Sequence, residues 1–149
     1  MIQRIQTVFL FLAACAGAGQ FVLPYATTDA DNAAKSISAL SDAVFNPFDN
    51  PGLMGLCILS ALVSLIAIFL YKNRSLQRRI TGAGVLVSFL LVALLGFSVW
   101  QMLQSMPEGG ALYYQPGVGL PVVGLLLQWL AGRSISRDEA LVRSMDRLR

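Results

Sequence analysis

The sequence contains no histidine, and its four long apolar runs contain no Lys, Arg, Asp or Glu. Proton relays and ion pathways use ionisable side chains within the membrane. The absence of such side chains from the apolar runs argues against a proton-coupled pump. Hydrolytic chemistry needs a base to activate a serine or cysteine, and without histidine only surface carboxylates or lysine could serve. We therefore expect that the protein is not an enzyme.

Cysteine is also scarce, because only Cys15 and Cys57 occur and both lie within apolar runs. A disulfide between them is not expected. Without histidine or an intramembrane carboxylate, the chain offers no ligand set for zinc, haem or an iron–sulfur cluster. We expect no metal and no other cofactor, and we interpret both cysteines as small packing residues.

Charged residues make up 13% of the 149 residues and hydrophobic ones 56%, whereas a soluble domain carries about 25% charge. Four apolar runs approach or exceed the roughly 20 residues that a helix needs to cross a bilayer. They are residues 5–23, 52–71, 80–103 and 113–131. Backbone groups in a bilayer must pair internally, so each run is expected to be helical. The sequence predicts an all-α integral membrane four-helix bundle that forms a single domain over residues 1–149.

The basic residues are distributed unevenly around these runs. Of the 11 Lys and Arg residues, all but Lys35 lie before the first run, between the second and third, or after the fourth. Short segments rich in Lys and Arg stay on the cytoplasmic side of a membrane. This pattern predicts that both termini are cytoplasmic and that the loop 24–51 is periplasmic. The net charge of +3 then reflects a basic inner face, and we expect no nucleic-acid partner.

The loop 24–51 is acidic and rich in alanine, which favours a simple linker over the alternative of a ligand-binding loop. Residues 46–52 are dense in turn-forming types. Asp49 or Asn50 is predicted to cap the second helix, with Pro51 in its first turn.

The N-terminus allows a second interpretation, because the run ending in Leu12-Ala13-Ala14-Cys15 matches a lipoprotein signal. Cleavage there would remove the first helix and leave an acylated Cys15. The single basic residue, Arg4, the early position of Cys15 and the apolar residues that continue to Leu23 favour a retained helix.

Small residues in the first run follow small-xxx-small spacing, as in Ala13 with Gly17 and Cys15 with Gly19. This spacing lets helices approach closely. Packing within one chain is the preferred interpretation, and self-association is the alternative. Polar residues within the runs are few: Gln20, Ser60, Ser64, Ser88, Ser98, Gln101 and Gln128.

The fourth run differs from the others, because residues 115–121 include two prolines and two glycines, with Gly124 one turn further. Such residues predict an irregular or kinked outer end, or a helix that begins late, near Val118 or Pro121.

The tail 132–149 has the signature of an amphipathic helix. Ser136 and Glu139 have the spacing of a capping box, and Leu141, Met145 and Leu148 recur on one helical face. We predict a short cytoplasmic amphipathic C-terminal helix. It could rest on the inner leaflet, on the base of the bundle or on a partner.

Three segments together resemble a known bacterial family. The opening 1–8, the hairpin 71–74 with Gln77, and the ending 138–149 are similar to the family catalogued as domain of unknown function 4293. The resemblance spans the whole chain and is carried by its termini and hairpin. It implies a multi-pass protein of the bacterial cytoplasmic (inner) membrane with no assigned activity, so no catalytic residues are carried over.

Our functional hypothesis is a non-enzymatic accessory or scaffold subunit of a bacterial inner-membrane complex. Its basic cytoplasmic face would contact a larger membrane protein assembly or anionic lipid headgroups, which attract juxtamembrane Lys and Arg. The predicted contact residues are Lys72, Arg74, Arg78, Arg79, Arg137, Asp138, Glu139 and Arg143. The alternative is an oligomeric channel or small-molecule carrier built around the fourth helix, which would involve Gly124 and Gln128. A lipid-modifying enzyme is the third hypothesis.

Overall fold

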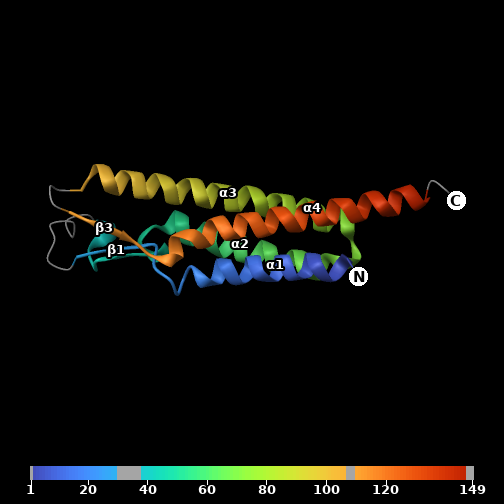
Figure 1. Cartoon of the computed structure of the whole chain (residues 1–149), viewed down its shortest axis with the longest axis horizontal. Helices are drawn as coiled ribbons and strands as arrows, with labels where there is room; N and C mark the ends of the chain where they lie inside the picture. The colour runs from blue at the N-terminus through green and yellow to red at the C-terminus, as the bar shows by residue number, and fades with distance from the viewer. Residues whose placement is uncertain (1, 30–37, 107–109, 147–149) are drawn as a thin grey trace.

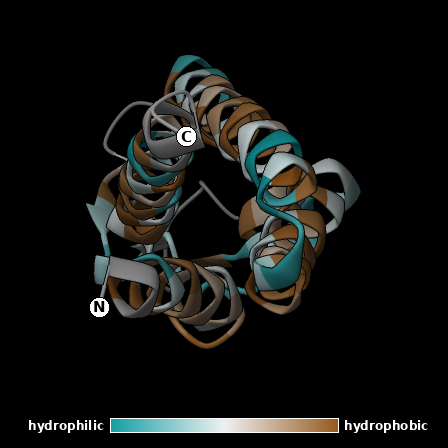
Figure 2. Ribbon diagram, turned by 90° about the vertical axis from the view of Figure 1, so that its right-hand side faces the viewer, coloured by the Kyte–Doolittle hydropathy of each residue, from teal (hydrophilic) through white to brown (hydrophobic). Residues whose placement is uncertain are grey.

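The computed structural model describes residues 2–29, 38–106 and 110–146, and four helices dominate it (Figure 1). They are α1 (Ile2–Gly19), α2 (Pro51–Phe69), α3 (Arg74–Gln104) and α4 (Leu120–Asp146). Each helix packs along two neighbours, in the cyclic order α1, α2, α3, α4. The view along the bundle shows the four helices around a common axis (Figure 2). The predicted packing of four helices is therefore confirmed.

Three of these helices are long and apolar enough to cross a membrane. The segments are Pro51–Lys72, Arg74–Gln104 and Pro116–Leu141, whereas the apolar part of α1, Ile5–Gly19, is shorter. Large apolar side chains such as Leu86 and Phe89 are more than half exposed on the outside of the bundle. Water-soluble proteins rarely expose extended apolar surfaces of this kind. These features are those of a multi-pass membrane protein.

The bundle has two distinct ends. The turn between α2 and α3 lies at one end, together with the start of α1 and the end of α4, and we call this the hairpin end (Figure 1). The opposite end carries a small sheet, and we call it the sheet end. Because the turn consists only of η4 (Leu70–Lys72) and Asn73, α2 and α3 are antiparallel neighbours.

Helix α3 begins at Arg74, six residues before the predicted start at residue 80. Asn73 sets this start, because its side-chain oxygen accepts a hydrogen bond of 3.1 Å from the backbone N–H of Leu76. Arginine and glutamine are good helix formers. The basic residues Arg74, Arg78 and Arg79, which precede the apolar run 80–103, therefore lie within the helix.

The predicted separate C-terminal helix is wrong, because α4 continues without a break to Asp146. Ser136 does not cap a new helix; its hydroxyl donates to the carbonyl of Gly132, one turn earlier, at 2.9 Å. Ala131, Ile135 and Asp138 are buried along one face of this continuous helix. The segment after residue 131 therefore belongs to the bundle. The side chains of Met145 and Leu148 lie outside the described residues.

The sheet was not predicted, and it corrects both the all-α assignment and the simple linker expected at 24–51. Strand β1 (Ala26–Thr28) lies between β2 (Val44–Phe45) and β3 (Leu112–Tyr114) and pairs antiparallel with both. The 3₁₀ turns η2 (Ser38–Leu40) and η3 (Pro47–Asp49) flank β2. Tyr25, Leu40 and Phe45 are fully buried there and pack against α2 and α3. This end of the bundle thus has a core of its own.

Two local predictions about the helix starts are confirmed. Asn50 caps α2, since its side-chain oxygen accepts from the N–H of Gly52 at 2.9 Å and Pro51 opens the helix. The fourth helix begins late, at Leu120, after η5 (Pro116–Gly119).

Close packing also explains two glycines. A Cβ atom on Gly117 would lie 2.2 Å from the carbonyl oxygen of Pro24, so only glycine fits beside that backbone. A Cβ on Gly17 would lie 3.0 Å from the Cβ of Ala61, which shows that this small residue of α1 packs against α2 within one chain.

Candidate interaction surface

A buried polar cluster occupies the interior of the bundle. The amide nitrogen of Gln128 in α4 donates to the hydroxyls of Ser64 at 2.7 Å and Ser60 at 3.2 Å, both in α2. The Gln128 carbonyl oxygen accepts from the hydroxyl of Ser88 in α3 at 2.9 Å. All four side chains are nearly inaccessible to solvent. Because they satisfy one another, the cluster serves to join three helices.

The sequence drew attention to these four polar residues, but it did not predict that they contact one another. Ser60 and Ser64 are one helical turn apart and so share a face, which was the available signal. Gly84 leaves space for the side chain of Gln128, since a Cβ on Gly84 would lie 3.2 Å from the side-chain amide oxygen of Gln128.

A second polar group lies beneath the sheet. The phenol of Tyr25 donates to the side-chain oxygen of Gln20 at 2.8 Å, and the thiol of Cys57 lies 3.4 Å from the phenol oxygen. Burial, together with the Cys57 contact, raises the pKa of Tyr25 well above its usual value, so the phenol stays protonated at neutral pH. Cys57 is thus a hydrogen-bonding residue, whereas Cys15 is exposed.

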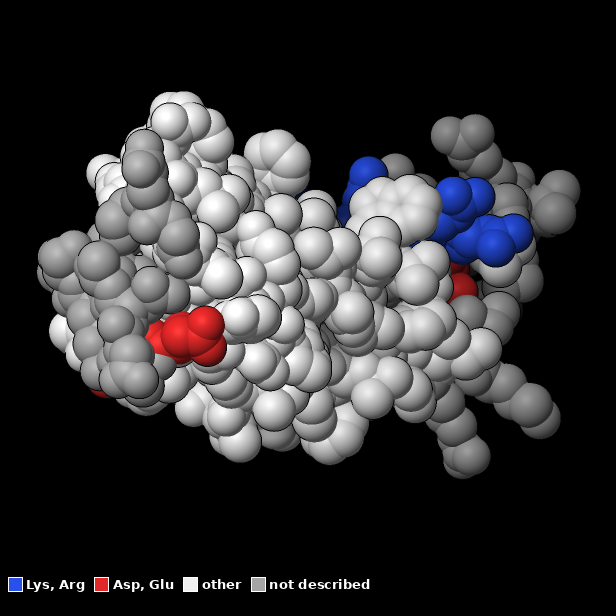
Figure 3. Space-filling view, turned by 60° about the vertical axis from the view of Figure 1, so that its left-hand side comes forward, with Lys and Arg blue, Asp and Glu red and all other residues white. Residues whose placement is uncertain are grey.

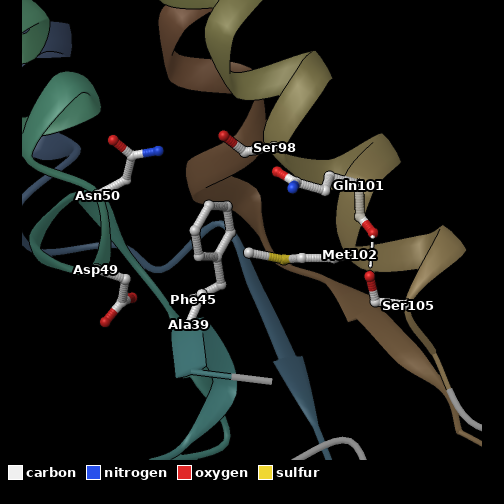
Figure 4. Close-up of a pocket in the computed structure, with 8 residues that line it drawn as sticks. All are labelled: Ala39, Phe45, Asp49, Asn50, Ser98, Gln101, Met102 and Ser105. Atoms are coloured by element: carbon white, nitrogen blue, oxygen red, sulfur yellow. Dashed lines mark hydrogen bonds between the residues drawn. The ribbon is translucent and has the colours of Figure 1, made fainter.

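A pocket of about 260 Å³ opens at the sheet end between α3 and the loop before α2 (Figure 4). Its lining comprises Ala39, Phe45, Asp49, Asn50, Ser98, Gln101, Met102 and Ser105. Partial burial raises the pKa of Asp49, although its bond from the Asn46 N–H, at 2.7 Å, opposes the shift. Asp49 and Asn50 each accept a backbone hydrogen bond that caps a local turn or helix. Their polarity therefore has a structural role.

The hairpin end gathers the basic residues (Figure 3). Lys72 lies in η4, Arg74, Arg78 and Arg79 lie in the first turns of α3, and Arg137, Asp138, Glu139 and Arg143 lie in α4. The structure brings Arg78 and Glu139 together in an ion pair of 3.1 Å. Lys72, Arg79 and Arg137 are exposed, and Arg74 is half-buried. The side chain of Arg143 lies outside the described residues.

Asp138 has a different environment from its neighbours. It is buried and accepts a hydrogen bond from the side-chain amide of Gln6, which ties α4 to α1. This predicted contact residue therefore faces the inside of the bundle. Its partner Gln6 was not singled out in the sequence, because no local pattern relates residues in the first and last helices.

Arg133 is an important basic residue that the predicted contact set omits. Its guanidinium carbon lies 5.7 Å from the centroid of the Trp129 ring, one turn earlier in α4. Arg133 and Arg78 border a groove of about 510 Å³ between α3 and α4. The spacing of Trp129 and Arg133, four residues apart, was the signal that could have identified this contact.

Charge at the hairpin end is not balanced within the described part of the chain. Among the side chains that the structure describes at this end, which leave out those of Arg4, Arg143 and Asp146, six are cationic and two are carboxylates, one of which is buried. The cationic residues are Lys72, Arg74, Arg78, Arg79, Arg133 and Arg137. No group of three or more His, Cys, Asp or Glu among the described residues is placed to hold a metal ion.

These features define the class as a helical, multi-pass membrane protein with one strongly basic end. The chain belongs to the family described as Domain of unknown function (DUF4293), which matches residues 2–148. No curated protein and no solved structure matches the chain.

Proposed function

We propose that the protein is a non-enzymatic accessory or scaffold subunit of a bacterial inner-membrane complex. The observation that carries the proposal is the unbalanced charge at the hairpin end. Lys72, Arg79 and Arg137 are exposed there and belong to none of the ion pairs of the described residues. A partner that presents carboxylates to this surface would gain electrostatic complementarity, which favours specific association.

The proposal places all four helices across the membrane. With its 18 residues, α1 is about 27 Å long, close to the hydrocarbon thickness of a bilayer. It packs along α2 and α4, so it lies at the same depth as the longer helices. The basic hairpin end would face the cytoplasm and the sheet end the periplasm.

The orientation is testable with single cysteines in a Cys15→Ser background. Asp42 is exposed at the sheet end and Arg79 at the hairpin end. In intact cells, a membrane-impermeant maleimide should label Asp42→Cys and spare Arg79→Cys. The reverse labelling would overturn the orientation.

The buried cluster supports a scaffold over a channel through one chain. Gln128 reaches from α4 to Ser60 and Ser64 of α2 and so fills the interior with residues already bonded to one another. The alternative of an oligomeric channel or carrier relied on a break within the fourth helix. Pro116, Gly117 and Gly119 precede α4. Pro121 lies in the first turn of α4, and the helix continues unbroken past Gly124, so the geometry supports the scaffold better.

The test of the scaffold is a pull-down from native membranes. The tagged chain, expressed at its natural level and extracted in mild detergent, should recover a larger membrane protein that mass spectrometry identifies. The triple variant Lys72→Glu, Arg79→Glu, Arg137→Glu should lose this protein, whereas Asp42→Lys at the opposite end should retain it. Recovery of the wild-type chain alone, or undiminished recovery of the partner by the triple variant, would overturn the proposal.

A further inference from the structure

The groove between α3 and α4 combines apolar walls with two guanidinium groups. Its lining residues are Arg78, Gly82, Val85 and Leu86 from α3 and Trp129, Gly132, Arg133 and Ser136 from α4. Nothing lies within 4 Å of the position that a Cβ on Gly82 would take. The absence of a side chain there keeps the groove open.

Two arginines line this groove, and both have N–H donors that could bind an anion. Arg133 stacks over Trp129 and belongs to no ion pair of the described residues. Arg78 gives only one nitrogen, Nη1, to Glu139. A guanidinium has five N–H donors, so this ion pair leaves donors of Arg78 for another acceptor. Phosphate is the anion that paired guanidinium groups suit best, because its oxygens accept two parallel hydrogen bonds.

The rest of the groove suits a hydrocarbon chain. Leu86 is 66% exposed and Trp129 is 49% exposed, so the apolar wall opens to the outside of two helices that are apolar enough to span a membrane. Tryptophan concentrates where hydrocarbon meets headgroups, which is also where a lipid phosphate lies. The apolar wall therefore matches the acyl chain of a lipid molecule, and the two arginines match its phosphate.

We propose that this groove binds an anionic glycerophospholipid, with its phosphate on Arg78 and Arg133 and an acyl chain along Val85, Leu86 and Trp129. Among the described side chains, Glu139 is the carboxylate that pairs with this site, and its single charge offsets one of the two guanidinium charges. A net positive site favours phosphatidylglycerol over a zwitterionic lipid. The inference is independent of the proposed scaffold, since it requires no protein partner.

Trp129 provides a direct readout, because the chain has only two tryptophans. The variant Trp100→Phe leaves Trp129 as the sole indole. It is reconstituted into phosphatidylcholine vesicles that contain, at equal mole fraction, either phosphatidylglycerol or phosphatidylcholine with brominated acyl chains. Brominated phosphatidylglycerol should quench Trp129 more strongly, and equal quenching by the two lipids would overturn the proposal.

Variants in the same background locate the site. Gly82→Leu should fill the groove and abolish the preference for phosphatidylglycerol. Gly96→Leu is the matched control, because Gly96 also lies on α3 with nothing within 4 Å of an added Cβ. Arg133→Gln should lower the preference about fivefold, the effect of one basic residue near an anionic surface, whereas Arg79→Gln, outside the groove, should lower it less.

Two further results distinguish a lipid in the groove from a lipid or a free anion bound elsewhere. A preference that survives Gly82→Leu would assign the lipid to the general basic surface and overturn the groove. Loss of the preference on adding inorganic phosphate, but not on adding chloride at the same ionic strength, would show that a free phosphate takes the site in place of the lipid and would overturn the lipid assignment. Circular dichroism and a monodisperse elution profile establish that each variant is folded. The pull-down variants at Lys72, Arg79 and Arg137 leave the groove lining unchanged, so the two proposals can fail separately.

Discussion

Gln128 of α4 donates a hydrogen bond of 2.7 Å to Ser64 of α2, so a single side chain links helices that are not neighbours in the cyclic order of the bundle. The same amide group bonds Ser60 and Ser88, which brings α3 into the contact. In hydrocarbon the helices gain no hydrophobic energy by leaving lipid for one another, so hydrogen bonds and close packing hold them together.

Replacing Gln128 with leucine should therefore weaken the bundle. Interhelical hydrogen bonds in membranes contribute about 0.6 kcal/mol each, so the loss of bonds to three residues should lower the free energy of unfolding by about 2 kcal/mol. Titration with SDS in mixed micelles measures this change. Gln104→Leu, at an exposed position near the end of α3, is the control and should have little effect. If Gln128→Leu leaves the free energy of unfolding unchanged, the cluster does not have a stabilising role.

The helical part of this fold follows from local features of the sequence. Long apolar runs marked α2, α3 and α4, and the cap at Asn50 was recognisable from its turn-forming neighbours. The start of α3 was predicted too late, because the basic residues before the apolar run were taken as the boundary of the helix. Arg74 and Arg79 lie inside α3 because a cap at Asn73, rather than the start of the apolar run, begins that helix.

Contacts between distant segments could not be predicted in this way. Strand β1 pairs Ala26 with Tyr114, and strands of two or three residues are too short to show alternation. The meeting of Gln128 with Ser88 depends on how each helix is rotated about its axis, and the apolar runs, which face both lipid and core, do not specify that rotation. The groove was missed for the same reason, since Arg78 and Arg133 lie on different helices.

Gly117 should not tolerate even alanine. The added Cβ would lie 2.2 Å from the carbonyl oxygen of Pro24 and 2.4 Å from that of Leu23, and backbone atoms cannot move aside as a flexible side chain can. We expect Gly117→Ala to displace η5 from the turn after α1 and to lower the thermal unfolding midpoint in detergent by several degrees. Gly119→Ala, two residues on, meets nothing within 4 Å and should unfold as the wild type does. Equal midpoints for the two variants would refute this packing.

Asp138 should stabilise the contact between α4 and α1 at the hairpin end. Asp138→Leu would leave the buried amide of Gln6 without its acceptor, at a cost of about 1–3 kcal/mol. Asp138→Asn retains a carbonyl oxygen that can accept the same bond, so its loss should be smaller. SDS titration compares the two variants. If leucine and asparagine destabilise equally, the hydrogen bond from Gln6 is not the source of the effect.

A substitution at Thr81 is predicted to raise the stability of the bundle rather than lower it. Its hydroxyl is the one buried side-chain polar atom without a hydrogen-bond partner in the described part of the chain. Thr81→Val replaces the hydroxyl with a methyl group of similar size, so it should remove the penalty of an unpaired polar group and raise the free energy of unfolding by about 1 kcal/mol. Ser88 lies two helical turns further along α3 and is equally buried, but its hydroxyl bonds both Ser60 and Gln128.

Ser88→Ala is therefore the matched comparison and should lower the free energy of unfolding by about 1 kcal/mol. SDS titration of the two single variants and of the double variant measures both effects. Thr81 and Ser88 share no hydrogen-bond partner in the described residues, so the effects should add. A loss of stability in Thr81→Val would mean that the threonine hydroxyl has a partner in the membrane, such as a bound water, and that the α3–α4 contact beside the groove is hydrated.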